Sequence, residues 1–154
     1  PSDAKMSRKV RVAVRGLLLH ENKLLLVNAW PDGQSDLMCA PGGGVEPHSS
    51  LPDNLIREMK EETGLDVTVH EQVLVNEFHD PVRDFHQVDV YFRVRAQNVS
   101  LSPDWQDPEG VVTTRRLVTR QELAHIRYQP DSLPAVAWAD EGAPSYDPLE
   151  PSLR

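Results

Sequence analysis

The sequence is poor in cysteine and has no long apolar run. Cys39 is the one thiol among 154 residues, so no disulfide can form within the chain. No stretch approaches the roughly 18 apolar residues that a membrane-spanning helix requires, and no secretory leader is recognisable. These absences exclude a disulfide-stabilised scaffold and predict a cytoplasmic protein without a membrane anchor.

Positive charge is also in short supply. The chain has 16 Lys and Arg residues against 24 Asp and Glu residues, which gives a formal net charge of -8 at pH 7. This balance argues against a DNA or RNA polymer as partner, because such polymers are bound through basic surfaces. The negative net charge is compatible with a single nucleotide as a small-molecule substrate, since a bound metal ion can neutralise the phosphates locally.

The length of the chain suits one compact domain. We expect that domain to cover residues 1–141. Residues 142–154 contain Pro144, Pro148 and Pro151 and little apolar content. They are therefore predicted to form a proline-rich tail, or an arm that reaches a partner subunit.

Hydrophobic periodicity predicts an α/β fold. Strands are expected at residues 9–20, 24–27, 37–40, 66–78, 87–95 and 111–118, with a polar turn at residues 79–85. Helices are expected at residues 52–63, after a capping box at residues 119–122, and at residues 132–140. This order fits a mixed sheet between helical layers, although propensity alone does not separate it from other α/β arrangements.

The most informative stretch runs from Pro41 to Leu65 and reads PGGGVEPHSSLPDNLIREMKEETGL. Its glycines favour tight turns that let backbone carbonyls approach a ligand. Ser50 is placed to cap a helix, Pro52 suits the first helical turn, and Gly64 suits a left-handed end. The stretch therefore predicts a glycine loop that leads directly into a helix.

Acidic residues gather on this predicted helix. Glu58, Glu61 and Glu62 fall on one arc, where like charges repel by about 0.2–0.5 kcal/mol per pair in an isolated helix. Divalent ions such as Mg²⁺ prefer carboxylate oxygens and recruit substrate phosphates as further ligands. The cluster alone is compatible with a solvated helix face or with a metal site. The preceding glycines and the Arg57-Glu58 pair favour the metal site.

The segment from Gly43 to Leu65 resembles the Nudix box, the 23-residue signature G-x5-E-x7-R-E-U-x-E-E-x-G-U, where U is a bulky aliphatic residue. The matching positions are Gly43, Arg57, Glu58, Met59, Glu61, Glu62, Gly64 and Leu65. The spacing is demanding, so a chance match is improbable. The resemblance implies the Nudix-type α/β/α sandwich, with a mixed β-sheet between helices.

One box position departs from the signature. Ser49 stands where the family has its first glutamate, a residue that supports the loop and can pair with the box arginine. Its absence is expected to leave Arg57 less well oriented unless another acid replaces it. Glu46 and Asp53 are the two nearby candidates for that replacement.

The resemblance also implies roles for the box residues. Glu58 and Glu62 would be the main metal ligands, and Glu61 would be a ligand or would orient water. A backbone carbonyl at Gly42–Gly43 would complete the shell around Mg²⁺, with Mn²⁺ as an alternative ion. Arg57 would act on catalysis structurally and electrostatically, by holding a glutamate.

Members of the family use as general base either a box glutamate or an acid outside the box. Glu109 is the outside candidate in this chain, with a solvated loop charge as the alternative interpretation. Glu77 is a weaker candidate. The catalytic set predicted from the sequence is therefore Arg57, Glu61, Glu62 and Glu109.

Two residues are candidates for binding substrate. Trp30 precedes a turn near the expected cleft and could stack on a base, with packing at the rim of the core as the alternative. Arg83 could hold a phosphate bidentately. The alternative for Arg83 is a surface ion pair with Asp80 or Asp84.

The function implied by the resemblance is Mg²⁺-dependent hydrolysis, by metal-activated water, of the diphosphate linkage in a nucleoside diphosphate derivative, NDP-X. ADP-ribose or a nucleotide sugar is the favoured substrate class. The alternatives are a house-cleaning (deoxy)nucleoside triphosphate pyrophosphatase and a nucleotide-binding module that has lost catalysis. A homodimer is an assembly that the resemblance and the predicted C-terminal arm both allow.

Overall fold

The computed structural model describes residues 9–31 and 33–153. The first half contains β1 (Arg11–His20), β2 (Lys23–Asn28), β3 (Met38–Cys39), β4 (Gly42–Gly44) and α2 (Leu51–Thr63). The second half contains β5 (Thr68–Asp80), β6 (Phe85–Arg95), β7 (Arg115–Thr119), α3 (Arg120–Leu123), α4 (Leu133–Ala137) and β8 (Glu150–Pro151). None of the described helices has the length and apolar character needed to cross a bilayer.

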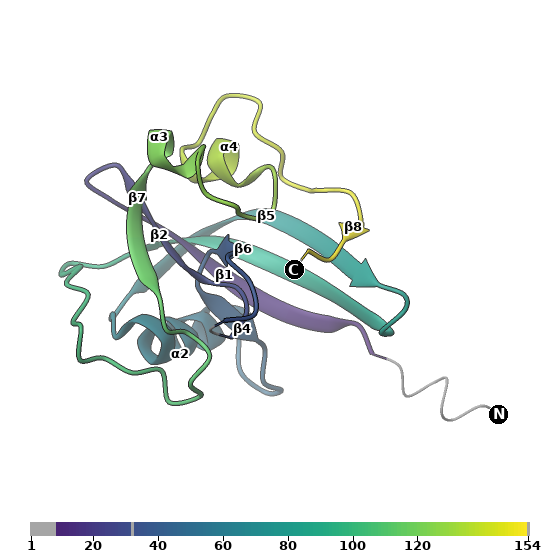
Figure 1. Cartoon of the computed structure of the whole chain (residues 1–154), viewed down its shortest axis with the longest axis horizontal. Helices are drawn as coiled ribbons and strands as arrows, with labels where there is room; N and C mark the ends of the chain where they lie inside the picture. The colour runs from purple at the N-terminus through teal and green to yellow at the C-terminus, as the bar shows by residue number, and fades with distance from the viewer. Residues whose placement is uncertain (1–8, 32, 154) are drawn as a thin grey trace.

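The strands form one mixed sheet in the order β3-β2-β1-β6-β5-β8, with β4 beside β1 and β7 beside β2. Parallel pairing joins β1 to β6, from Arg11 opposite Gln87 to Leu18 opposite Val94. Figure 1 shows α2 on one side of the sheet and α3 and α4 on the other. The predicted mixed sheet between helical layers is thereby confirmed.

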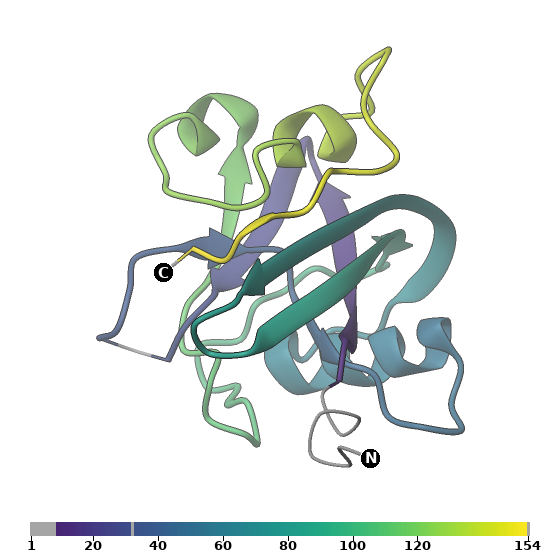
Figure 2. The ribbon, with the colours of Figure 1, turned by 90° about the vertical axis from the view of Figure 1, so that its right-hand side faces the viewer.

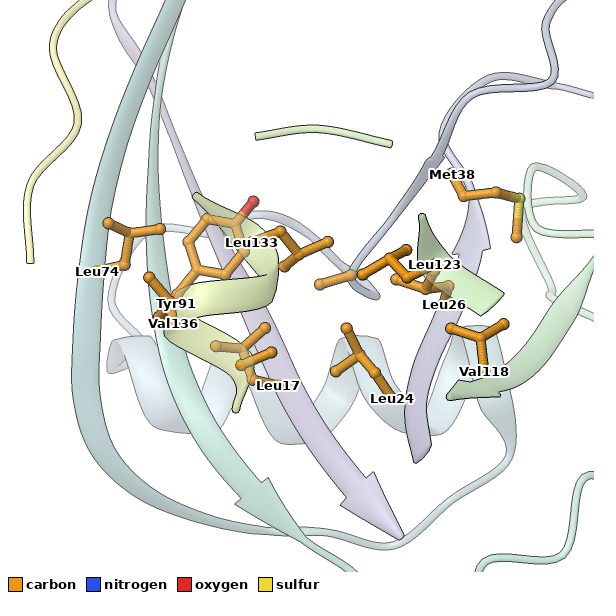
Figure 3. Packing of buried hydrophobic residues seen from close by; sticks show 12 residues of the cluster. Leu17, Leu24, Leu26, Met38, Leu74, Tyr91, Val118, Leu123, Leu133 and Val136 are labelled. Carbon is orange, nitrogen blue, oxygen red and sulfur yellow. The ribbon is translucent and has the colours of Figure 1, made fainter. Parts of the chain in front are cut away.

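Strand alternation builds a separate core on each face of the sheet. On β1, Val14 and Leu18 belong to the cluster under α2, whereas Leu17 belongs to the cluster under α4. Figure 3 shows this second cluster, in which Leu133 and Val136 of α4 lie over side chains of the sheet. Both faces of β1 are therefore buried, which fixes its register.

The predicted ends of the box helix are confirmed. The Ser50 hydroxyl accepts a hydrogen bond from the Asp53 backbone at 3.1 Å, and a proline occupies the first turn of α2. At the other end, Gly64 has φ 76° and donates its backbone N–H to Lys60. Leu55 and Met59 are fully buried and anchor the helix on the sheet. The acidic arc of the helix is therefore held in a fixed orientation toward the glycines.

Two of the differences between the predicted and observed element boundaries have a direct cause in hydrogen bonding. The expected strand at 111–118 is paired only from Arg115, because the Asn28 side chain bonds to residues 111, 113 and 114 and the Asp107 carboxylate bonds to residue 112. The expected turn at 79–85 is shorter, because β5 and β6 remain paired through His79 opposite His86 and Asp80 opposite Phe85.

The C-terminal segment lies against its own sheet. The backbones of Ser145 and Asp147 bond to Val75, and β8 pairs with β5 in parallel. Figure 2 shows the segment, in yellow, running beside β5. Residues 145–152 thus form the outer edge of the sheet in this chain. The domain boundary placed at residue 141 stays a prediction.

We predict that Asp147→Ala destabilises the protein. Asp147 is buried and accepts hydrogen bonds from Asn76 at 2.9 Å and from Ser132 at 2.7 Å. Removing it leaves the buried Asn76 amide and the half-buried Ser132 hydroxyl without that partner, which costs about 1–3 kcal/mol. Chemical denaturation should therefore show a lower free energy of unfolding.

The matched control is Tyr146→Phe, because Tyr146 is exposed and its hydroxyl makes a surface contact with Glu77. This substitution should change stability by less than about 0.5 kcal/mol. Equal stability of the two variants would show that the hydrogen bonds of Asp147 contribute nothing to the stability of the fold.

Candidate active site

A cleft of about 280 Å³ opens between β1, β4, α2 and the loop before β7. It is rich in charge of both signs. Its acidic lining residues are Glu46, Glu58, Glu62, Asp107 and Glu109, and its basic lining residues are Arg11, Arg15 and Arg57. A larger hollow of about 780 Å³ lies between the start of β5 and the end of β6, but none of the sequence-predicted site residues lines it. The smaller cleft is therefore the candidate active site.

The glycines of β4 allow the acidic helix to approach the backbone. A Cβ on Gly42 would lie 1.9 Å from the Val14 carbonyl oxygen, so only glycine fits. The Gly42 N–H in turn donates to Glu62 Oε1 at 3.0 Å. A Cβ on Gly43 would lie 2.6 Å from Glu58 Oε2. The glycine loop and both carboxylates thus form one closely fitted unit.

The two carboxylates are costly to keep charged in this environment. Burial raises the pKa of Glu62 to about 8, although Arg15 and the Gly42 N–H oppose the rise. Burial also raises the pKa of Glu58, and Arg57 opposes that rise. A cation placed between these carboxylates would favour their charged forms.

Arg57 is held by several oxygen acceptors. Its guanidinium lies 3.0 Å from Glu58 and 3.5 Å from Glu61, and it donates to Asn54 Oδ1 at 2.9 Å. Glu46 lies 3.8 Å away. Of the two candidates for the role of the missing box glutamate, the structure places Glu46 beside the arginine. Ser49 itself is exposed and lies outside the cleft lining.

The residues present fit a divalent cation. The oxygen donors that line the cleft include carboxylates, the ligands that Mg²⁺ and Mn²⁺ prefer. Burial raises the pKa of both Glu58 and Glu62, and a bound cation would offset this effect by favouring their charged forms. Across residues 9–31 and 33–153, no three His, Cys, Asp or Glu side chains converge closely enough to form a ready metal shell. Any ion held here therefore needs further ligands, such as substrate phosphates or water.

The loop that carries Glu109 reaches the same cleft. The Asp107 carboxylate accepts hydrogen bonds from the Glu109 and Val112 backbones, each at 3.0 Å, and so stabilises the turn. Asn28 then fastens the following residues to β2 through three hydrogen bonds of 2.8–3.0 Å. Glu109 itself is exposed at the cleft. The outside candidate for the base is thus brought to the box glutamates.

Other sequence-predicted residues lie elsewhere. Glu61 is half-buried beside Arg57 and is not part of the cleft lining. The Trp30 indole donates to the Leu153 carbonyl at 3.2 Å. Arg83 lies in the exposed β5–β6 turn, 3.1 Å from Asp80, which is one of the ion pairs considered for it. Neither Trp30 nor Arg83 lines the cleft.

Sequence reasoning missed the two arginines that β1 contributes. Arg11 and Arg15 line the cleft, and they are four residues apart on a strand, so both lie on the same face. Arg15 lies 3.6 Å from Asp89 and donates to the carbonyls of Ala40 and Gly42. Alternation along β1 could have placed both arginines on one face, but only the fold shows that this face meets β4.

The fold and the cleft together define a class of protein, an α/β/α sandwich whose glycine strand and acidic helix share one charged cleft. The family model of the NUDIX domain matches residues 9–139. The chain therefore belongs to the Nudix hydrolase family. Members of this family generally use divalent metal ions.

A relative of known activity agrees with this assignment. An ADP-ribose pyrophosphatase of Methanocaldococcus jannaschii is 36% identical over 73 residues, which are 47% of this chain and 42% of that relative. The match thus spans less than half of the relative's length.

Two solved structures share the fold. A NUDIX hydrolase from Nitrosomonas europaea aligns over 86% of this chain and 88% of its own, with TM-score 0.70 and 21% identity. An ADP-ribose pyrophosphatase from Streptococcus suis aligns over 94% and 100%, with TM-score 0.64 and 20% identity. At these identities the likeness concerns the fold alone.

We predict that the metal-free protein loses stability as the pH rises from about 4.5 to about 8. The pKa of Glu62 is raised in the folded state, so folding favours its protonated form, and that contribution is lost above the folded value. Thermal unfolding should show Tm falling across this window more steeply for the wild type than for Glu62→Gln. Parallel curves for the two proteins would contradict the prediction.

Proposed function

We propose that the chain hydrolyses the diphosphate linkage of a nucleoside diphosphate derivative, with ADP-ribose the favoured substrate and Mg²⁺ the favoured ion. The observation that carries the proposal is the meeting of Glu58, Glu62, the Gly42–Gly43 backbone and Glu109 at one cleft. The name of the Methanocaldococcus jannaschii relative supports ADP-ribose as the substrate.

Glu58 and Glu62 would hold the ion, together with a carbonyl of Gly42–Gly43. Glu61 is retained as an additional ligand or as the residue that orients water. When bound, the ion neutralises the diphosphate and lowers the pKa of the attacking water. The backbone N–H of Gly42 orients the Glu62 carboxylate from the other side.

Arg57 keeps the acidic side chains in place. It bridges Glu46, Glu58 and Glu61, so its charge offsets their mutual repulsion. Removal of the arginine would leave Glu58 buried beside the other carboxylates without its cation, and its pKa would rise further. Arg57 thus acts on the reaction through the glutamates that it positions.

Glu109 is proposed as the general base. Its carboxylate is exposed at the cleft and is not tied to an arginine by any ion pair found in residues 9–31 and 33–153. A free carboxylate oxygen can take the proton of the attacking water, whereas Glu58 and Glu62 are directed toward β4. The turn held by Asp107 fixes the position of its backbone.

The alternative of a binding module that has lost catalysis rested on Ser49. The position of Glu46, 3.8 Å from Arg57, supports Glu46 as the replacement for the missing glutamate and so favours a catalytic protein. A triphosphate pyrophosphatase would use the same carboxylates, and its release of pyrophosphate from an NTP distinguishes it. The homodimer and the cytoplasmic location stay predictions.

We predict hydrolysis of ADP-ribose to AMP and ribose 5-phosphate in the presence of Mg²⁺. Glu62→Gln should abolish most turnover, because it removes a carboxylate from the proposed metal site. Glu109→Gln should lower kcat by about 10²–10⁴-fold if the residue is the general base. Chromatography of the products, with nucleotide sugars and NTPs assayed in parallel, measures each effect.

Glu77→Gln is the matched control, since Glu77 is a weaker candidate that lies on β5 and contacts Tyr146 instead of the cleft. It should retain wild-type turnover. The function proposed here is refuted if no NDP-X compound is hydrolysed, and the role of Glu109 is refuted if its variant keeps the wild-type kcat.

A further inference from the structure

Arg11 differs in its surroundings from the other arginines of the cleft. Arg15 is paired with Asp89, and Arg57 is paired with glutamates. Within the described residues, no carboxylate oxygen lies within 4.0 Å of the Arg11 guanidinium. Its positive charge is therefore not offset locally, although it lines a cleft in which acids outnumber bases.

The guanidinium is nevertheless held in a defined place. Its Nη1 donates to Gln87 Oε1 at 2.5 Å. A Cβ added to Gly44 would lie 2.6 Å from Arg11 Nη2, so the absence of a side chain there lets the guanidinium lie directly on β4. One of the five N–H groups is thus committed to Gln87, and the rest of the donor fork is available to a ligand.

Gln87, the neutral partner of Arg11, is itself held in place by the charge of Asp89. Gln87 is 1% exposed, and its Nε2 donates to Asp89 Oδ1 at 2.7 Å. An ionised carboxylate only accepts hydrogen bonds, so the amide must turn its nitrogen to Asp89 and its oxygen to Arg11. Asp89 is in turn held by Arg15 at 3.6 Å. This chain orients Arg11 without neutralising it.

We propose that Arg11 binds a phosphate group of the diphosphate substrate, and that Gln87 is its positioning residue. The inference rests on the proposed function for the identity of the substrate. Arginine matches phosphate oxygens bidentately, and this is the interaction that an oriented, uncompensated guanidinium can supply. The acids of the cleft would repel a diphosphate, so the positive charge of Arg11 beside them directs its binding.

The test compares Arg11→Gln with Arg116→Gln. Arg116 is exposed on β7 and does not line the cleft, so its variant loses the same charge elsewhere. Calorimetry measures the binding of inorganic pyrophosphate to each metal-free protein, and steady-state kinetics with ADP-ribose and Mg²⁺ gives KM and kcat. Thermal unfolding of each variant verifies that it is folded.

Arg11→Gln should weaken pyrophosphate binding and raise KM by about tenfold to a hundredfold, the usual loss for a hydrogen bond to a charged group. The change in kcat should be smaller than the change in KM. Arg11→Lys keeps the charge but lacks the planar fork, so it should restore part of the loss.

Equal pyrophosphate affinity and KM for Arg11→Gln and Arg116→Gln would overturn the proposal. That result, with normal wild-type turnover of ADP-ribose, leaves the proposed function intact. Conversely, pyrophosphate binding that depends on Arg11 in a protein that hydrolyses no NDP-X compound would support the phosphate site and refute the proposed function.

Discussion

The close contact between the glycine strand and the carboxylates of Glu58 and Glu62 is the interaction on which the site depends. Burial makes both acids costly to ionise, and the Gly42 N–H, Arg15 and Arg57 offset only part of that cost. Such partial compensation is a feature of functional sites more often than of structural ones. Burial disfavours the charged form of each carboxylate when no cation is present. The same burial makes the binding of a cation more favourable.

The rest of the fold keeps this contact in register. Parallel pairing of β1 with β6 is buried by a hydrophobic cluster on each face, so β1 cannot slip without exposing one of them. β4 pairs with β1, and α2 packs on β1. This one strand therefore sets the positions of both the glycines and the acidic side chains of α2. The charged cleft thus lies where two well-packed elements, β4 and α2, meet.

Much of the fold could be predicted from the sequence, because it depends on local chemistry. The caps at Ser50 and Gly64, the capping box at Thr119 and the alternation of the strands depend on neighbouring residues, and the structure has them all. The cleft needed contacts between distant residues. Arg11 and Arg15 join it through the pairing of β1 with β4, and Asn28 redirects residues 111–114 from the expected strand. The separation of Arg83 from the cleft likewise follows from the length of the β5–β6 hairpin.

Three hydrogen bonds of Asn28 fasten the end of the acidic loop to β2. One amide on β2 holds the chain where the loop ends, and the Trp105 indole donates to the Glu61 carbonyl near its start. Between them, the turn is held by the Asp107 carboxylate. Neither of the two anchors at the ends of the loop draws on the large hydrophobic cores on the two faces of the sheet. The acidic segment can therefore vary without disturbing the sheet, provided that Asn28, Asp107 and the proposed base Glu109 are retained.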